Sequence, residues 1–261
     1  MPFVGSGQSD IWWDSQGSGT PILLINGLSS PSSVWFRLAP LLATEHRVLT
    51  FDNLGTGRTG TPDEPWTLAA MADAAVAVIA AAGEPSTAVL GMSAGGLIAQ
   101  ELTLEHPELV SSLILVATHA GAQYMRGDPE AFAAIASAGA LPALERVAYL
   151  APFTYASSTP PERAAEDEAV RALQPTDQAG YQGQLAAAMP WSRLDDLQTV
   201  SCPTLVLHGE QDRLVAVSCG RQLADTIPGA RLTVLPDAAH QLFTDQPESA
   251  ARVVIDFLKI T

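Results

Sequence analysis

A serine stands between two glycines in the segment Val89–Gly96, which reads Val-Leu-Gly-Met-Ser-Ala-Gly-Gly. The apolar residues before Gly91 predict a strand, and the run Ala94–Glu105 predicts a helix directly after the serine. The G-x-S-x-G pattern therefore falls on a strand-to-helix turn, where Ser93 would be an exposed nucleophile on strained backbone. Gly91 and Gly95 have no Cβ, so the strand and the helix can approach closely. The alternative is a glycine-rich turn before a packed helix, and the strand-to-helix context favours the nucleophile.

A serine nucleophile needs a base that takes its proton, and the base needs a carboxylate that orients it. Among the five histidines, His240 lies in a loop between the last predicted strand and the last predicted helix. Nothing about that loop needs an imidazole for packing. Asp212 follows the predicted strand Thr204–His208, so it lies at the end of a neighbouring strand. The chain order Ser93, Asp212, His240 matches one known arrangement of a catalytic triad.

Other acidic and imidazole groups compete for roles at the same site. Glu210 precedes Asp212 by two residues and is the alternative acid. His119 follows a predicted strand at the same sheet edge, so we expect it to line the pocket. His208 is expected to pack or to cap its turn, and His46 and His106 are expected to be surface or capping residues. Because no two histidines have a short ligand spacing and no Cys-x-x-Cys occurs, the sequence predicts no metal site.

Two backbone N–H groups are candidates for stabilising a negative oxygen. Ala94 begins the predicted helix, whose first N–H groups have no partner within the helix. The second candidate is Leu28, which follows Asn26-Gly27 at the end of another predicted strand. We expect these two N–H groups to form an oxyanion hole. A Gly55-x-Gly57 segment has no Gly-Lys-Ser/Thr and is interpreted as a turn.

Strand-like and helix-like segments alternate in the first half of the chain and again after Asp195. Continuous apolar strands between helices indicate a mostly parallel sheet covered on both faces. The predicted strands are Ile22–Asn26, His46–Asp52, Thr87–Leu90, Ser111–Thr118, Thr204–His208 and Arg231–Leu235. The predicted helices are Val34–Ala43, Leu68–Ala82, Ala94–Glu105, Val217–Thr226 and Pro247–Lys259.

From 120 to 194 the alternation is replaced by helix-like pieces without strands. These are Pro129–Ser137, Pro142–Leu150, Pro161–Leu173 and Gln178–Ala188. We expect a single domain over 1–261 with a helical lid, or cap, inserted at 120–194. The lid would cover the carboxyl edge of the sheet, where open α/β sheets place their sites.

Composition excludes several classes of protein. The chain has 261 residues, enough for one α/β domain with an insertion, and a formal net charge of -15. Nucleic acid and anionic membranes are not expected partners, because both attract a basic patch. No apolar run is long enough to span a bilayer and the N-terminus lacks signal-peptide features, so a cytoplasmic protein is expected. Cys202 and Cys219 are expected to be buried thiols.

These motifs together resemble the α/β-hydrolase superfamily over nearly the whole chain. The resemblance is closest to lidded serine hydrolases of the 3-oxoadipate enol-lactonase and pimeloyl-carrier-protein methyl ester esterase type. It rests on Asn26–Leu28, Phe51–Arg58, Gly91–Gly96, Leu207–Asp212 and Ala239-His240. Two departures are Asn26, where the family commonly has His, and Thr59, where Ser is usual. The resemblance implies an α/β-hydrolase fold with the lid after the sixth strand.

The resemblance implies a serine hydrolase of carboxylic esters or lactones that needs no cofactor. Its partner would be a small-molecule substrate, and the sequence leaves the oligomeric state open. Two alternatives remain: the same triad used for acyl transfer, perhydrolysis or C–C hydrolysis, or a ligand receptor without enzymatic activity.

The pocket lining is predicted from the aromatic and imidazole residues at and after the start of the insertion. The candidate substrate-binding residues are His119, Tyr124, Phe153 and Trp191. A charged substrate would need a cation near the lid. Arg146, Arg163 and Arg171 neighbour acidic residues and are expected at the surface, which leaves Arg126 and Arg193. We therefore expect a neutral, mostly apolar substrate.

Overall fold

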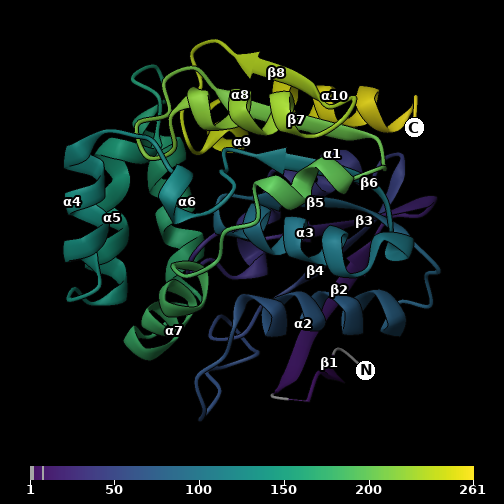
Figure 1. Cartoon of the computed structure of the whole chain (residues 1–261). Coiled ribbons are helices and arrows are strands. Elements are labelled where there is room, and N and C mark those ends of the chain that lie inside the picture. Colours follow the sequence, from purple (N-terminus) through teal and green to yellow (C-terminus); the bar gives the residue numbers. More distant parts are fainter. Residues whose placement is uncertain (1–2, 8) are drawn as a thin grey trace.

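The computed structural model describes residues 3–7 and 9–261 and has an eight-stranded sheet with helices on both faces (Figure 1). The spatial order of the strands is β1-β2-β4-β3-β5-β6-β7-β8. The pairs β1–β2 and β2–β4 are antiparallel, and the other pairs are parallel. The strands are β1 Phe3–Gly5, β2 Asp10–Gln16, β3 Thr20–Ile25, β4 His46–Phe51, β5 Thr87–Met92, β6 Val110–Val116, β7 Thr204–Gly209 and β8 Arg231–Leu235.

Helices cover the sheet because successive strand residues point to opposite faces and both sets are apolar. In β3, Leu23 and Ile25 pack with α2 (Leu68–Ala81) and α3 (Ala94–Glu105), while Ile22 and Leu24 pack with α1 (Leu38–Leu42) and α10 (Pro247–Leu258). Each fully buried aliphatic side chain contributes about 1.5–3 kcal/mol to folding. The remaining helices of the sheet domain are α8 (Val217–Thr226) and the short α9 (Leu242–Asp245). The predicted α/β sheet with two covered faces is confirmed.

The predicted helix Val34–Ala43 is divided in the structure into a 3₁₀ turn, Ser32–Phe36, and the short helix α1. Pro40 explains the division, since it has no N–H to donate and its ring excludes the carbonyl group four residues before it. The strands β1 and β2 were not predicted. Of their residues only Ile11 is fully buried, so the apolar signal of these two strands is weak.

Between β6 and β7 the chain forms four α-helices, here called the helical insertion (Figure 1). They are α4 Pro129–Ala138, α5 Ala143–Thr154, α6 Pro161–Ala172 and α7 Gln178–Ala188. In Figure 1 these green and teal helices stand together at one end of the sheet. They begin where expected, although α5 runs four residues further than predicted, through Pro152.

The described residues also bear on the predicted burial of the two cysteines and on membrane-spanning helices. Cys219 is buried in α8, but Cys202 is only half-buried, and the two thiols are unpaired. Within the described ranges, none of the helices combines the length and the apolar character that a membrane span requires.

Candidate active site

Ser93 occupies the turn between β5 and α3, as its motif predicts. Its backbone has φ 55° and ψ −124°, a conformation that L-residues rarely adopt. Close approach explains the flanking glycines: a Cβ on Gly91 would overlap the Gly95 carbonyl, and one on Gly95 would overlap the Asn26 carbonyl. The turn is fixed by hydrogen bonds from Ser93 N to Val116 O (2.9 Å) and from the Thr118 hydroxyl to Ser93 O (2.7 Å). The Ser93 hydroxyl is not used as a helix cap, so it is available for chemistry.

His240 and Asp212 are joined by a hydrogen bond. The distance from His240 Nδ1 to Asp212 Oδ2 is 2.9 Å, and both side chains are buried. The other carboxylate oxygen, Oδ1, accepts the N–H groups of Leu214 and Val215 at 2.9 Å each. These two bonds fix the carboxylate, so its free oxygen can only face the imidazole. Because Nδ1 is engaged, Nε2 is the ring nitrogen left for proton transfer.

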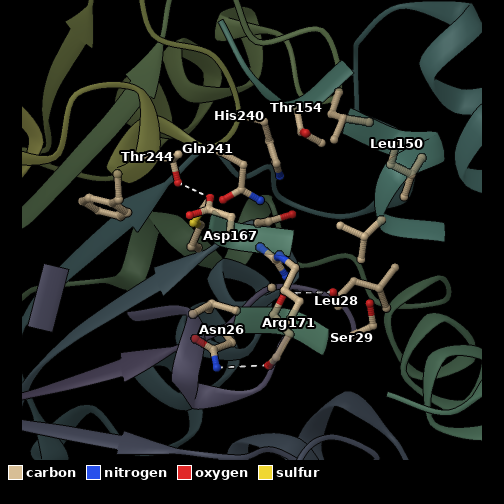
Figure 2. A pocket seen from close by; sticks show the side chains of 18 of the residues that line it. Asn26, Leu28, Ser29, Leu150, Thr154, Asp167, Arg171, His240, Gln241 and Thr244 are labelled. Carbon is tan, nitrogen blue, oxygen red and sulfur yellow. Dashed lines mark hydrogen bonds between the residues drawn. The ribbon is translucent and has the colours of Figure 1, made fainter. Parts of the chain in front are cut away.

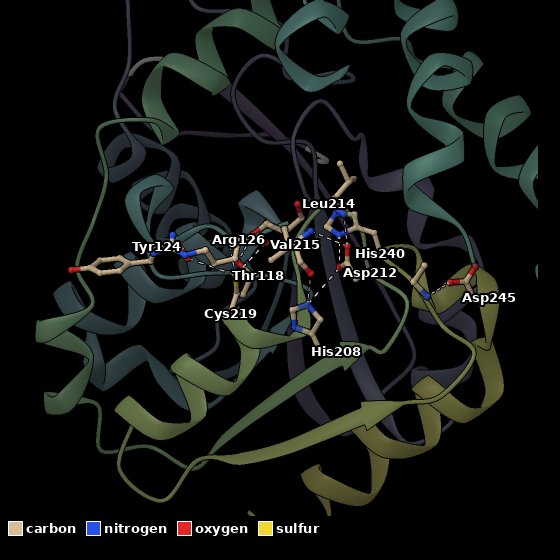
Figure 3. A network of polar contacts seen from close by, with 12 residues as sticks. Thr118, Tyr124, Arg126, His208, Asp212, Leu214, Val215, Cys219, His240 and Asp245 are labelled. Carbon is tan, nitrogen blue, oxygen red and sulfur yellow. Dashed lines mark hydrogen bonds and ion pairs between the residues drawn. The ribbon is translucent and has the colours of Figure 1, made fainter. Parts of the chain in front are cut away.

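A second histidine contacts the same carboxylate (Figure 3). His208 Nε2 lies 3.6 Å from Asp212 Oδ2 and 2.7 Å from the carbonyl oxygen of Val215. Burial alone would raise the pKa of Asp212, but the neighbouring His240 and His208 outweigh burial and lower that pKa to about 2. Asp212 is therefore ionised at neutral pH and can stabilise an imidazolium at His240.

Ser93 and His240 line one cavity of about 160 Å³ at the carboxyl end of the sheet. Figure 2 shows His240 among the side chains that line this cavity. The loops after β3, β5 and β8 supply one wall, and the helical insertion supplies the other. No hydrogen bond between Ser93 and His240 is found among the described residues; in serine hydrolases this contact commonly tightens only with substrate. The cavity also contains Leu28, and Ala94 begins α3 directly behind Ser93.

The predicted oxyanion loop follows β3 and is held by the insertion. Ser29 has φ 55°, its N–H donates to Gln184 Oε1 (2.8 Å), and its carbonyl accepts from the Thr176 hydroxyl (2.9 Å). In the part of the chain that the structure describes, neither the Leu28 N–H nor the Ala94 N–H donates a hydrogen bond. Both donors remain available to an oxygen in the cavity.

Comparison with known proteins agrees with this architecture. A family described as the alpha/beta hydrolase fold matches residues 20–247. The chain belongs to this family. Among its relatives, a poly(3-hydroxyalkanoate) depolymerase of Ectopseudomonas oleovorans is 28% identical, over 92% of this chain and 84% of the relative.

Solved structures of other α/β-hydrolases superpose over nearly the full length. Est816, described as an N-acyl homoserine lactone degrading enzyme, has a TM-score of 0.82 and 27% identity, covering 98% of this chain and all of its own. The enol-lactonase of Burkholderia xenovorans LB400 has a TM-score of 0.87 with 23% identity, covering 99% and 100%. At that identity the second likeness supports the fold alone.

The structure of this α/β-hydrolase places the four predicted substrate-binding residues outside the cavity, which corrects our expectation. Trp191 is buried in the core and donates from Nε1 to Glu101 Oε2 (2.8 Å). Tyr124 packs against the same core, and Phe153 lies under the Arg213 guanidinium at 4.8 Å.

The fourth of these residues, His119, is buried and accepts the Gly121 N–H at Nδ1 (3.1 Å). Burial lowers its pKa to about 4, and the nearby His240 adds to that lowering. The aromatic and imidazole side chains that we assigned to the pocket therefore stabilise the base of the insertion and the adjacent core.

The arginines also differ from expectation. Arg146 and Arg171 line the cavity, although both were expected at the surface. Arg193 instead pairs with Glu101, Glu105 and Asp196 outside it. Arg126 is exposed and donates to backbone carbonyls of its own turn.

Three polar residues that hold the site were not predicted. Asp245 accepts the N–H of Ala239, next to His240, at 2.7 Å, and the N–H of Ala156 in the insertion at 3.2 Å. Asp167 lines the cavity and accepts from the Tyr155 hydroxyl at 3.3 Å. Gln184 receives the Ser29 N–H and donates to Leu54 O at 2.8 Å. These residues have no motif of their own, so only their contacts reveal them.

A metal centre was not predicted for this chain. Within residues 3–7 and 9–261, no cluster of three or more His, Cys, Asp or Glu side chains could hold a metal ion.

Proposed function

We propose that this α/β-hydrolase is a serine hydrolase that cleaves a small carboxylic ester or lactone through an acyl-enzyme on Ser93. The observation that carries the proposal is the 2.9 Å bond between His240 and Asp212, with His240 in the same cavity as a serine held at φ 55°. A buried imidazole that is fixed by an ionised carboxylate and shares a cavity with a serine hydroxyl is the combination that activates a serine.

In the first half-reaction, Ser93 Oγ attacks the carbonyl carbon while His240 Nε2 takes the hydroxyl proton. The N–H groups of Leu28 and Ala94 stabilise the resulting oxyanion. Asp212 stabilises the imidazolium. When the C–O bond of the ester breaks, the leaving alcohol receives the proton from His240. Water then attacks the acyl carbon while His240 takes a proton from the water. The bond between the acyl carbon and Ser93 Oγ breaks, Ser93 regains a proton from His240, and the carboxylic acid is released.

We further propose that the helical insertion acts as a cap that excludes water from Ser93. In support, residues of the cap from α4 to α7 line the cavity, including Ile135, Leu150 and Tyr181. A volume of about 160 Å³ corresponds to about five water molecules. Such a space suits a short acyl chain. The N-acyl homoserine lactone named for Est816 belongs to the proposed class of esters and lactones.

A fluorophosphonate probe tests the proposal directly, because it labels only an activated serine. Wild-type protein should be labelled at Ser93 and should hydrolyse at least some members of a panel of short esters, lactones and thioesters. Ser93→Ala should lose both properties while unfolding at the same temperature as wild type. Absence of labelling in folded wild-type protein would contradict the proposal and favour a ligand receptor of the same fold.

A further inference from the structure

The cavity that holds Ser93 carries more positive than negative side chains, although the chain as a whole has a net charge of -15. Three arginines line it, Arg37, Arg146 and Arg171, against one carboxylate, Asp167. An excess of positive charge in a buried cavity is costly unless an anion enters it. The partners of each arginine show which one is left for a ligand.

Two of the arginines already have partners. Arg37 pairs with Glu166 at 2.7 Å and with Asp167 at 3.3 Å, so its charge is neutralised. Arg171 donates to the Ser30 hydroxyl at 2.6 Å. Ser30 in turn donates to Leu28 O, so Arg171 helps to hold the oxyanion loop.

Neither Arg171 nor Arg146 has an ion pair with a carboxylate in the described ranges, but Arg171 is half-buried and donates to a side chain, whereas Arg146 is only 3% exposed and has no side-chain hydrogen-bond partner. Its guanidinium stacks on the Tyr181 ring at 4.1 Å from the centroid, and Nη2 donates to Leu141 O at 3.2 Å. Its Nε is buried with no hydrogen-bond partner. Burial lowers the pKa of Arg146, and the charges of Tyr181 and Asp177 oppose that lowering without cancelling it. Buried arginines are rare unless they are paired.

We propose that Arg146 is a specificity-determining residue that binds a second, anionic carboxylate of the substrate. Stacking on Tyr181 fixes the plane of the Arg146 guanidinium. The planar set of N–H donors that results has the geometry that binds a carboxylate. This inference rests on the proposed function and narrows it to esters or lactones that carry a free carboxylate away from the scissile carbonyl. It replaces our expectation of a neutral substrate.

The carboxylate could belong to the acyl part or to the alcohol part of the substrate, so the test has two arms. The acyl arm compares mono-4-nitrophenyl adipate with the 4-nitrophenyl ester of adipamic acid, its neutral amide. The alcohol arm compares the hexanoate ester of 4-hydroxybenzoate with that of 4-hydroxybenzamide. In each pair the shape is nearly constant and only the charge changes. The measured quantity is kcat/KM, after subtraction of the uncatalysed rate.

We expect wild-type protein to prefer the carboxylate in one arm by at least tenfold. Arg146→Gln should abolish that preference by lowering kcat/KM for the anion alone, and Arg146→Lys should restore part of it. Arg126→Gln, which changes an exposed arginine outside the cavity, should leave the preference unchanged. A wild-type preference below tenfold in both arms overturns the inference, and so does a preference that persists in Arg146→Gln.

If Arg146→Gln does not fold, the wild-type ratios can still overturn the inference, and a reduced preference in Arg146→Lys then supports the role of Arg146. The two proposals also fail in different ways. If the esters with a neutral amide group and the esters with a carboxylate are cleaved at similar rates, and cleavage depends on Ser93, only the role of Arg146 is refuted. Failure to cleave any of the four esters, together with no labelling of Ser93 by the fluorophosphonate, refutes the proposed function itself.

Discussion

Asp212→Asn removes the charge of the carboxylate and keeps its shape, so it separates the roles of the two. In the wild-type structure Oδ1 accepts two backbone N–H groups, from Leu214 and Val215. An asparagine oxygen must take that place, so its NH₂ group faces His240 Nδ1. His240 then has to present a lone pair at Nδ1 and carry its proton on Nε2. In that tautomer His240 cannot take the proton of Ser93, although the side chains keep their positions.

The expected loss in kcat is about 10³–10⁴, which corresponds to about 4–5.5 kcal/mol of transition-state stabilisation. The same substitution should also lower the free energy of unfolding, by a smaller amount that is measured separately from kcat. The pKa of Asp212 is lowered from 3.8 to about 2, which is worth about 2.4 kcal/mol. A carboxyl with a lowered pKa adds this stability above pH 3.8 and loses it as the pH falls towards 2. At pH 7 the variant should therefore unfold roughly 5–10 °C below wild type.

The assay is hydrolysis of a 4-nitrophenyl ester at pH 7 and 25 °C, with circular dichroism showing that the variant is folded. Glu210→Gln is the matched control, because Glu210 is exposed and lies two residues away. It should retain wild-type kcat. Near-normal activity of Asp212→Asn together with a large loss in Glu210→Gln would refute the assignment of the acid.

Three further perturbations test other parts of the site. In Gly27→Ala the new Cβ would lie 3.1 Å from Ser93 Cβ. This crowding should lower kcat/KM about tenfold or more while the unfolding temperature stays the same. Unchanged kinetics would contradict the expected crowding of Ser93. Trp191→Ala removes a buried ring and its bond to Glu101, and should lower the free energy of unfolding by about 3–5 kcal/mol, measured in urea, without altering KM. A changed KM would restore Trp191 to the pocket. The pKa of His119 is lowered from 6.5 to about 4, so the unfolded chain protonates first and stability should fall by about 3 kcal/mol between pH 6.5 and 4. His119→Gln should show a smaller fall in urea titrations over that range.

The framework of this fold could be predicted because its signals are local. The strand-to-helix turn at Ser93, the loop at His240 and the acid after β7 all follow apolar strands, and parallel strands bring such ends to one edge. The catalytic roles of these residues remain predictions. The continuous apolar strands likewise predicted that both faces of the sheet are covered. Strands β1 and β2 could hardly be predicted, because Ile11 is their only fully buried residue and they show little apolar pattern.

The pocket could not be predicted because its lining depends on how the helices of the insertion pack. Arg146 follows Glu145 on a helix with a polar surface, so sequence alone suggested a solvated arginine. Tyr181 covers it from another helix, α7, and the positions of the two residues in the sequence do not predict that contact. Trp191 is the opposite case. An aromatic side chain near the end of the insertion suggested a pocket, but Glu101 of α3 binds its indole within the core.

The bridge made by Gln184 has a consequence for how such enzymes diversify. Its amide joins the oxyanion loop, at the Ser29 N–H, to the loop after β4, at Leu54 O, and it is carried by α7 of the insertion. The insertion and the reacting centre are therefore not independent modules. A chimera that received α4–α7 from another hydrolase would exchange its pocket and, at the same time, lose a support of its oxyanion loop. We expect such a graft to keep the loop in place only when the incoming segment restores these contacts. The inheritance of a new pocket is then restricted by a few side chains far from Ser93 in the sequence, namely Gln184, Thr176 and Arg171.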